Sequence, residues 1–503
     1  MKMKKIVLLL LITVFSLHGC KNIDFGDYNK NPIGPSEPSP KDLLAGGMMN
    51  YFNNTGRYEL TVPTLYVQWQ VQTAYPEEMK YADVPVAWTA KYVRVLSNFK
   101  TNIDYIQAHR DDVTPYGYPD NQIAVNKIMM AYVFKELADS YGDIPFSEAL
   151  DPDNITPKYD SQIEVYHGII DMLKEARDMI DVSVANANIV GDILYNGDII
   201  KWKKLANSLI LHAALQLSNV PSEVNYAKQE FTAALNNSAG VLEDIIDDAW
   251  IHYSAADRFF QNPYSRMRRG DYALAKEFTD ALKGTGSCNP TFNTTYDPRI
   301  EIYSSNPADD GSPYSDCSPG GGSAQISDYI WSVTEPDKPL PFFLSSWAWL
   351  DRAEAAARGW TSEDYDTALE NGLRNSFDAI ASHYANYSNS SDVDAYITAR
   401  IADANNATYG DGNEDPKVIV VAEEKWKAMF PRGFEAWTQW RRLHYPTIQS
   451  PPANETYNGG VIPRRYSYPS EEATVNPEHR DEAVQNGLTP AEDFNTSRTR
   501  WDQ

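Results

Sequence analysis

The sequence predicts an all-α fold in which antiparallel helix pairs form a scaffold and a long loop-rich segment covers it. Three observations lead to this prediction. Apolar residues recur at helical spacing in several separate segments. Short turns join these segments into pairs of about 34 residues, which is the pattern of tetratricopeptide repeats. Between residues 245 and 345 the helical period disappears, although aromatic residues remain frequent.

Length and charge narrow the classes of protein. The chain has 503 residues, of which 42% are hydrophobic, and this suits one large globular domain or two closely joined ones. The formal net charge of -25 argues against a nucleic-acid-binding surface and against electrostatic attachment to anionic lipid.

The N-terminus reads as a bacterial export signal. Three lysines precede the apolar run 6–17, which is too short to span a bilayer. The run ends in Leu17-His-Gly-Cys20, a lipobox in which the cysteine thiolate accepts a lipid. We predict a signal peptide over residues 1–19, lipidation at Cys20 and a tether over residues 20–40. The alternative is an ordinary signal peptide with a chance cysteine.

The first helices surround a central one. Residues 40–53 predict a helix, the proline-broken stretch 60–92 is partly loop, and a helical period resumes over residues 85–109. The next helical segment begins at residue 121, and within residues 126–139 apolar side chains cover most of the helix surface, so this helix is expected at the centre. Gly142 and Pro145 end it, and residues 161–180 return antiparallel.

The remaining helices follow the same logic. The predicted pairs are 197–217 with 221–235, 347–359 with 362–377, and 418–429 with 433–442. We therefore predict one domain over residues 41–503, with the helix-pair scaffold at about 41–240 and 346–385 and C-terminal helices and a tail at about 417–503.

Residues 245–345 form a different kind of segment. They are rich in Gly, Pro, Asp and Asn but contain enough large aromatics to be ordered, so we expect loops and short helices laid over the scaffold. Such an excursion is a usual place for a binding site. Cys288 and Cys317 lie within it, and in an exported protein they invite a disulfide. The alternative is two free thiols.

Several motifs resemble those of the SusD/RagB-like family of outer-membrane nutrient-binding lipoproteins. They include Asp27-Tyr-Asn-Lys-Asn-Pro32, Asp139-Ser-Tyr-Gly-Asp-Ile-Pro-Phe-Ser-Glu-Ala149 and Gly433-Phe-Glu-Ala-Trp-Thr-Gln-Trp-Arg-Arg442. Together with the helix pairs, the resemblance implies a tetratricopeptide-like α-solenoid of about four pairs. It also implies an outer-membrane location facing the cell exterior, and a SusC-like TonB-dependent β-barrel transporter as partner.

Catalytic motifs are lacking. The chain has no nucleophile elbow, phosphate loop or dinucleotide fingerprint, and its eight histidines form no metal-binding pattern, so we predict neither an enzyme nor a transition-metal site. A glycoside hydrolase remains an alternative, because two carboxylates across a groove leave no sequence pattern. The run Asp411–Asp415 is a candidate for a structural calcium ion, although a solvated turn explains it as well.

Aromatic side chains in loops are the remaining candidates for function. A flat ring covers the C–H face of a sugar while polar neighbours bind its hydroxyls. The predicted ligand-binding residues lie in the proline-broken stretch and in the excursion: Trp69, Tyr75, Tyr81, Trp88, Tyr329 and Trp331. We predict a surface protein that captures oligosaccharides for import. A binder of peptides or another nutrient is the alternative.

Overall fold

The computed structural model describes residues 38–54, 60–84, 88–317, 322, 324–328, 330–332, 334–384 and 390–502. Pro40–Gln503 form one compact unit. The predicted signal peptide, Cys20 and nearly all of the predicted tether lie outside the described residues.

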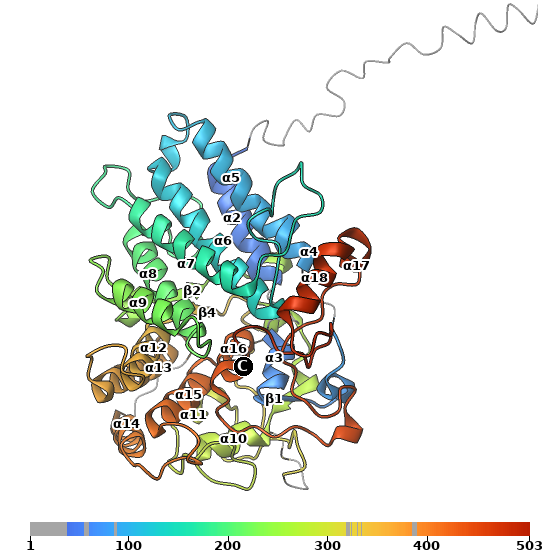
Figure 1. The fold of residues 1–503 in the computed structure, drawn as a ribbon. Coiled ribbons are helices and arrows are strands. Elements are labelled where there is room, and N and C mark those ends of the chain that lie inside the picture. Colours follow the sequence, from blue (N-terminus) through green and yellow to red (C-terminus); the bar gives the residue numbers. More distant parts are fainter. Residues whose placement is uncertain are drawn as a thin grey trace, which may run out of the picture. The chain divides into compact units, whose positions relative to one another are not determined.

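Four helix pairs form the scaffold of the described chain. The pairs are α2 (Pro40–Asn54) with α5 (Ser97–Ala108), α6 (Pro119–Tyr141) with α7 (Gln162–Met179), α8 (Ile199–Gln216) with α9 (Val224–Leu235), and α12 (Ser345–Ala357) with α13 (Tyr365–His383). Helix α5 contacts α6, α7 contacts α8, and α8 contacts α12, so each pair stacks on the next (Figure 1). The prediction of an all-α, tetratricopeptide-like fold is confirmed.

Helix α6 is the centre of the scaffold. Almost all of its residues are buried, and it ends at Gly142, whose φ of 96° favours glycine. It begins at Pro119, two residues before the predicted start at residue 121, and its first turn contains buried polar residues. Gln122, for example, donates to the carbonyl oxygens of Val113 and Gly117, at 3.1 and 2.7 Å. Buried polar residues of this kind do not show in an apolar pattern.

The second helix of the first pair is continuous with two shorter elements. These are α4 (Trp88–Ala90) and the π-helical η4 (Lys91–Leu96), which runs directly into α5. The short helices elsewhere before the excursion are α3 (Val62–Tyr66), η3 (Pro76–Lys80) and η5 (Thr114–Tyr116).

The excursion contains short helices, as expected, and also strands that the sequence did not reveal. Its helices are η6 (Ile245–Asp247), η7 (Arg258–Phe260), η8 (Pro263–Arg266), η9 (Arg269–Asp271), α10 (Lys276–Lys283) and α11 (Ile300–Tyr303). Strand β2 (Ala249–Ile251) pairs antiparallel with β4 (Leu340–Phe343), and β1 (Gln70–Gln72) pairs antiparallel with β3 (Tyr272–Leu274). Strands of three or four residues are too short to show alternation.

The C-terminal part adds further helices. They are α14 (Ser390–Ala404), α15 (Pro416–Ala428), α16 (Gly433–Leu443), η10 (Ala453–Glu455), α17 (Glu472–Val475) and α18 (Pro477–Gly487). Helix α15 contacts α12, α14 and α16, and α16 contacts α3. The C-terminal helices therefore close back onto the scaffold and onto the segment that leads into β1.

Candidate functional site

A surface hollow is built on the antiparallel pair of β1 and β3. Gln72 pairs with Tyr272 at the end of this sheet. The backbone NH and the hydroxyl of Thr73 both donate to the carbonyl oxygen of Asp271, at 2.7 and 3.0 Å. The sheet thus holds the loop after β1 beside the loop before β3.

The loop after β1 presents Tyr75. The side-chain oxygen of Gln72 accepts hydrogen bonds from the backbone NH groups of Ala74 and Tyr75, at 2.9 and 3.1 Å, which fixes the turn. Pro76 then begins η3. The Tyr75 side chain is 53% exposed, so its ring is available to a ligand.

The loop before β3 forms the opposite wall. Two short helices in it are capped by side chains: Asp257 accepts from the NH of Phe259 at 2.7 Å, and Asn262 accepts from the NH of Tyr264 at 2.8 Å. Asn262 also donates to the carbonyl oxygen of Lys338 at 2.7 Å, which ties this wall to the segment before β4. The caps fix the backbone that carries the arginines of η7 and η8.

The two walls enclose a hollow of about 470 Å³. Its lining residues are Gln72, Tyr75, Glu78, Arg258, Pro263, Arg266, Met267, Arg268, Asp271 and Tyr272. An exposed ring beside guanidinium and carboxylate groups offers both an apolar face and hydrogen-bonding partners. This combination matches the surface of a sugar, which alternates C–H patches with hydroxyls.

A buried aromatic cluster supports the hollow. The Tyr272 hydroxyl donates to Glu78 at 3.1 Å and thereby links the two walls. The ring of Trp331 lies 5.5 Å from that of Tyr272 and 4.8 Å from that of Tyr264. Because Trp331 and Tyr264 are fully buried, they hold Tyr272 in place rather than face solvent.

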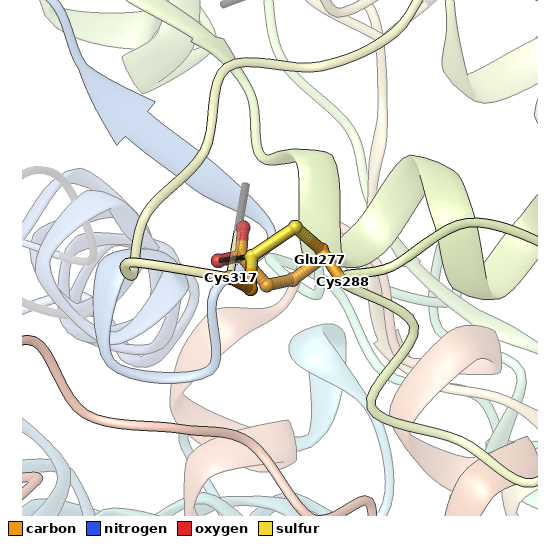
Figure 2. Close-up of side chains that lie close together, drawn as sticks. All are labelled: Glu277, Cys288 and Cys317. Atoms are coloured by element: carbon orange, nitrogen blue, oxygen red, sulfur yellow. Dashed lines mark hydrogen bonds between the residues drawn. A yellow bond between two sulfur atoms is a disulfide. The ribbon is translucent and has the colours of Figure 1, made fainter. Parts of the chain in front are cut away.

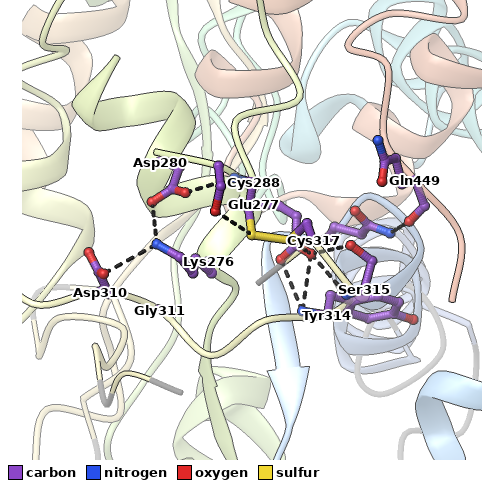
Figure 3. Close-up of a disulfide and its surroundings, with 12 residues drawn as sticks. Lys276, Glu277, Asp280, Cys288, Asp310, Gly311, Tyr314, Ser315, Cys317 and Gln449 are labelled. Atoms are coloured by element: carbon purple, nitrogen blue, oxygen red, sulfur yellow. Dashed lines mark hydrogen bonds and ion pairs between the residues drawn. A yellow bond between two sulfur atoms is a disulfide. The ribbon is translucent and has the colours of Figure 1, made fainter. Parts of the chain in front are cut away.

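The disulfide braces the same region. Cys288 and Cys317 are joined with their sulfurs 2.04 Å apart (Figure 2). The carboxylate of Glu277 lies beside the bond and accepts hydrogen bonds from the backbone NH groups of Tyr314 and Ser315, at 3.0 and 2.9 Å (Figure 3). The Tyr314 ring stacks on that of Tyr81 with centroids 6.4 Å apart, directly after η3. The cross-linked segment therefore supports the loop that carries Tyr75.

Glu277, Cys288 and Cys317 are also the group of potential metal ligands that converges in the described part of the chain. Their chemistry does not suit a metal ion, since both sulfurs are bonded to each other and no thiolate is left. Burial raises the pKa of Glu277, and the backbone donors of Ser315 and Tyr314 oppose that rise. The cluster is a structural brace.

Four of the predicted ligand-binding aromatics are buried, and the prediction is corrected for the three of them that are at most 1% exposed. Trp69 and Trp331 are 0% exposed and Tyr81 is 1% exposed. Trp69 packs against the rings of Phe430 and Phe278, with centroids 5.3 and 5.8 Å away. A ring without an open face cannot cover a sugar, so these residues form the core behind the site.

The other predicted aromatics have three different placements. Tyr75 lines the hollow. Trp88 is buried among the rings of Tyr141 and Tyr159 and lines a separate, more apolar hollow of about 410 Å³ beside α4 and α17. Tyr329 lies outside the described residues. Of the five predicted residues that the structure describes, Tyr75 is the one that lines the hollow beside β1 and β3.

Sequence analysis missed the arginines of the hollow. Arg258, Arg266 and Arg268 lie within one short stretch of a strongly acidic chain, and this local reversal of charge was the available signal.

The loop Asp411–Asp415, the candidate for a calcium ion, has hydrogen bonds of its own. Asp411 accepts from the Tyr445 hydroxyl at 2.8 Å, and Asp415 accepts from the NH of Lys417 at 2.8 Å as the cap of α15. Calcium in this loop stays a prediction.

Comparison with known protein families shows which family the chain belongs to. The SusD-like family model with the description "Starch-binding associating with outer membrane" matches residues 32–469. The chain belongs to the SusD-like family. The family resemblance seen in the sequence motifs is thereby confirmed. Among the curated proteins searched, none matches this SusD-like chain.

Solved structures share the fold along nearly the whole chain. A chitin-binding protein is 25% identical with a TM-score of 0.74, covering 92% of this chain and 100% of its own. A SusD homolog from Bacteroides fragilis is 22% identical with a TM-score of 0.74, covering 93% and 100%. A chitin-binding SusD homolog from Flavobacterium johnsoniae is 21% identical with a TM-score of 0.68, covering 92% and 98%. Among the described residues, every helix is too short or too polar to span a lipid bilayer.

Proposed function

We propose that this SusD-like protein is a lipid-anchored, outward-facing protein of the outer membrane that captures oligosaccharides and delivers them to a SusC-like TonB-dependent transporter. The observation that carries the proposal is the hollow beside β1 and β3 in a chain of this family. There the exposed ring of Tyr75 lies beside hydrogen-bonding side chains. Two structural neighbours are chitin-binding proteins, which supports a glycan as cargo.

The proposed role is binding without turnover. An open hollow with one exposed ring gives modest affinity and fast release, which suits cargo that must be handed to a transporter. Glu78, a carboxylate of the hollow, accepts a hydrogen bond from Tyr272 and serves to join the two walls.

Calorimetry with a panel of oligosaccharides tests capture. The sample for calorimetry is the protein without residues 1–20, because this form retains the compact unit Pro40–Gln503. Binding heat with intact sugar afterwards supports the proposal. Cleaved sugar contradicts the proposal and favours a glycoside hydrolase. The absence of binding heat with every sugar contradicts it and favours a peptide or another nutrient as the ligand.

Membrane attachment and the partner need separate experiments in cells. Labelling with radioactive palmitate is expected to mark the protein, and Cys20→Ala is expected to remove the label and release the protein from the membrane fraction. Protease added to intact cells is expected to digest the protein if it faces outward. Gentle extraction is expected to co-purify a TonB-dependent β-barrel, and its absence after cross-linking would contradict the transporter role.

A further inference from the structure

We infer that the hollow selects an acidic glycan, whose carboxylate or sulfate group is bound by Arg258, Arg266 and Arg268. This inference rests on the proposed function and narrows it to a class of cargo. It is carried by the placement of three cations in one hollow and by the lack, among the residues that the structure describes, of protein anions paired with them.

The three guanidinium groups have no side-chain hydrogen-bond or ion-pair partner among the residues that the structure describes. Their neighbour Arg269 differs, because it pairs with Asp328 and donates to the carbonyl oxygen of Ile326. Buried arginines elsewhere are also paired; Arg400, for example, contacts Glu423 at 2.6 Å and Glu424 at 2.8 Å. Among the described residues, three arginines without a side-chain partner thus lie together in this hollow.

The arginines also act on one another. Arg266 is partly buried, and burial lowers the pKa of its guanidinium. The charge of Arg258 lowers this pKa further, against an opposing effect of Tyr253. A guanidinium stays protonated at neutral pH, so two cations that repel each other line the same hollow. A bound anion would relieve this repulsion.

The two carboxylates of the lining leave the hollow with an excess of positive charge. The hollow is lined by two carboxylates, Glu78 and Asp271, and by three arginines, so its formal charge is positive. The whole chain, by contrast, has a formal net charge of -25. Glu78 accepts the Tyr272 hydroxyl and so already has a partner. The net negative charge of the chain repels an anionic ligand, whereas the arginines of this hollow attract it.

The arrangement suits an acidic sugar rather than a free anion. Arginine binds carboxylate or sulfate with paired hydrogen bonds in a planar fork. Tyr75 supplies an exposed ring on the opposite wall of the same hollow. A ligand that satisfies both walls carries a negative group on or beside an apolar sugar face, as in a uronic acid residue or a sulfated sugar.

Matched pairs of ligands test the inference by calorimetry. The pairs are oligouronates with their methyl esters, and sulfated oligosaccharides with their desulfated forms, so that each pair shares a backbone and differs in charge. We expect one acidic member to bind about tenfold or more tightly than its neutral partner. We also expect this preference to shrink as sodium chloride is raised. The pair that shows the preference identifies carboxylate or sulfate as the recognised group.

Variants assign the effect to the arginines. Arg266→Gln and Arg258→Gln are each expected to weaken the acidic ligand about tenfold and to leave the neutral one nearly unchanged. Arg94→Gln, at an exposed arginine of η4 that does not line this hollow, is the matched control and is expected to have no effect. Since Arg258 is exposed, its variant keeps the test valid even if Arg266→Gln misfolds.

Each contrary result has a distinct meaning. Equal binding within every pair, or binding of neutral sugars alone, overturns the inference and leaves the proposed function standing. An acidic preference that survives both variants overturns the assignment to these arginines. Failure to bind any sugar overturns the inference and the proposed function together.

Discussion

The guanidinium of Arg442 in α16 donates two hydrogen bonds to the carboxylate of Glu354 in α12, at 2.5 and 2.8 Å, and both side chains are fully buried. Lys425 of α15 binds the same carboxylate at 2.6 Å and also contacts Asp351 at 2.7 Å. Burial alone would raise the pKa of Glu354, but the charges of Arg442 and Lys425 outweigh burial and hold this pKa well below its usual range. The C-terminal helices are thus joined to the last helix pair of the scaffold by buried ion pairs.

Removal of this carboxylate is expected to destabilise the protein strongly. Glu354→Ala leaves Arg442 without its buried carboxylate partner and deprives Lys425 of one of its two buried carboxylate partners. We expect this to cost about 3–5 kcal/mol of unfolding free energy. Asp104→Ala breaks the exposed pair of Asp104 with Lys100 and is expected to cost about 1 kcal/mol or less. Urea denaturation of both variants measures the difference, and equal losses would contradict a structural role for the buried pair.

Asp248 predicts a dependence of stability on pH. Burial raises its pKa to about 7, against hydrogen bonds from Ser345, and the nearby charge of Asp247 raises it further. The folded state therefore holds a proton that the unfolded state releases above about pH 4. The resulting stabilisation of the folded state is fully present below the unfolded pKa and is lost as pH rises through about 7. The loss in unfolding free energy is roughly 4 kcal/mol.

Asp248→Asn is expected to remove this loss, because the amide cannot ionise. The variant should unfold at higher urea than the parent at pH 8 and at a similar concentration at pH 4.5. Asp104→Asn, at an exposed position of α5, serves as control and should follow the parent at both values. If the difference in unfolding free energy between the parent and Asp248→Asn is the same at pH 4.5 and pH 8, the assignment of the pH dependence to Asp248 is refuted.

Much of the fold could be predicted from the sequence because its helices are long and apolar. The central helix 126–139 was expected from its broad apolar surface, and the structure extends it to α6 (Pro119–Tyr141). Helix α14 was not predicted, since it lies between two recognised segments. The sheet of β1 and β3 joins residues about 200 positions apart, and neither strand is long enough to leave a pattern.

The site could be predicted only in part, because its aromatics differ in burial rather than in sequence context. Trp69 and Tyr75 lie in the same proline-broken stretch, yet Trp69 is buried and Tyr75 is exposed. The difference arises from tertiary contacts. The rings of Phe278 in α10 and of Phe430, just after α15, cover Trp69, while the turn fixed by Gln72 leaves Tyr75 exposed. Such contacts leave no local signal.

The disulfide is expected to stabilise the domain and the hollow together. It closes a loop with a separation of 29 residues, which on the chain-entropy model corresponds to about 3–4 kcal/mol. Cys288→Ala with Cys317→Ala should lower the urea midpoint accordingly. It should also weaken glycan binding, because the cross-linked segment stacks on Tyr81 through Tyr314. Parent protein treated with reductant provides a check, and an unchanged midpoint would contradict the expected stabilisation.

Tyr75 is the residue whose loss should weaken sugar binding most directly. Tyr75→Ala removes the exposed ring of the hollow while the turn remains, since the turn is held by Gln72 and by backbone bonds to Asp271. A ring against a sugar face is worth about 1 kcal/mol or somewhat more, so we expect affinity to fall about tenfold with little change in unfolding free energy. Tyr296→Ala removes an exposed tyrosine that does not line the hollow and should bind like the parent. Calorimetry with the sugar selected from the panel separates the two variants. If Tyr75→Ala keeps full affinity while the sugar still binds, the sugar lies elsewhere on the protein, and the apolar hollow beside Trp88 becomes the next place to mutate.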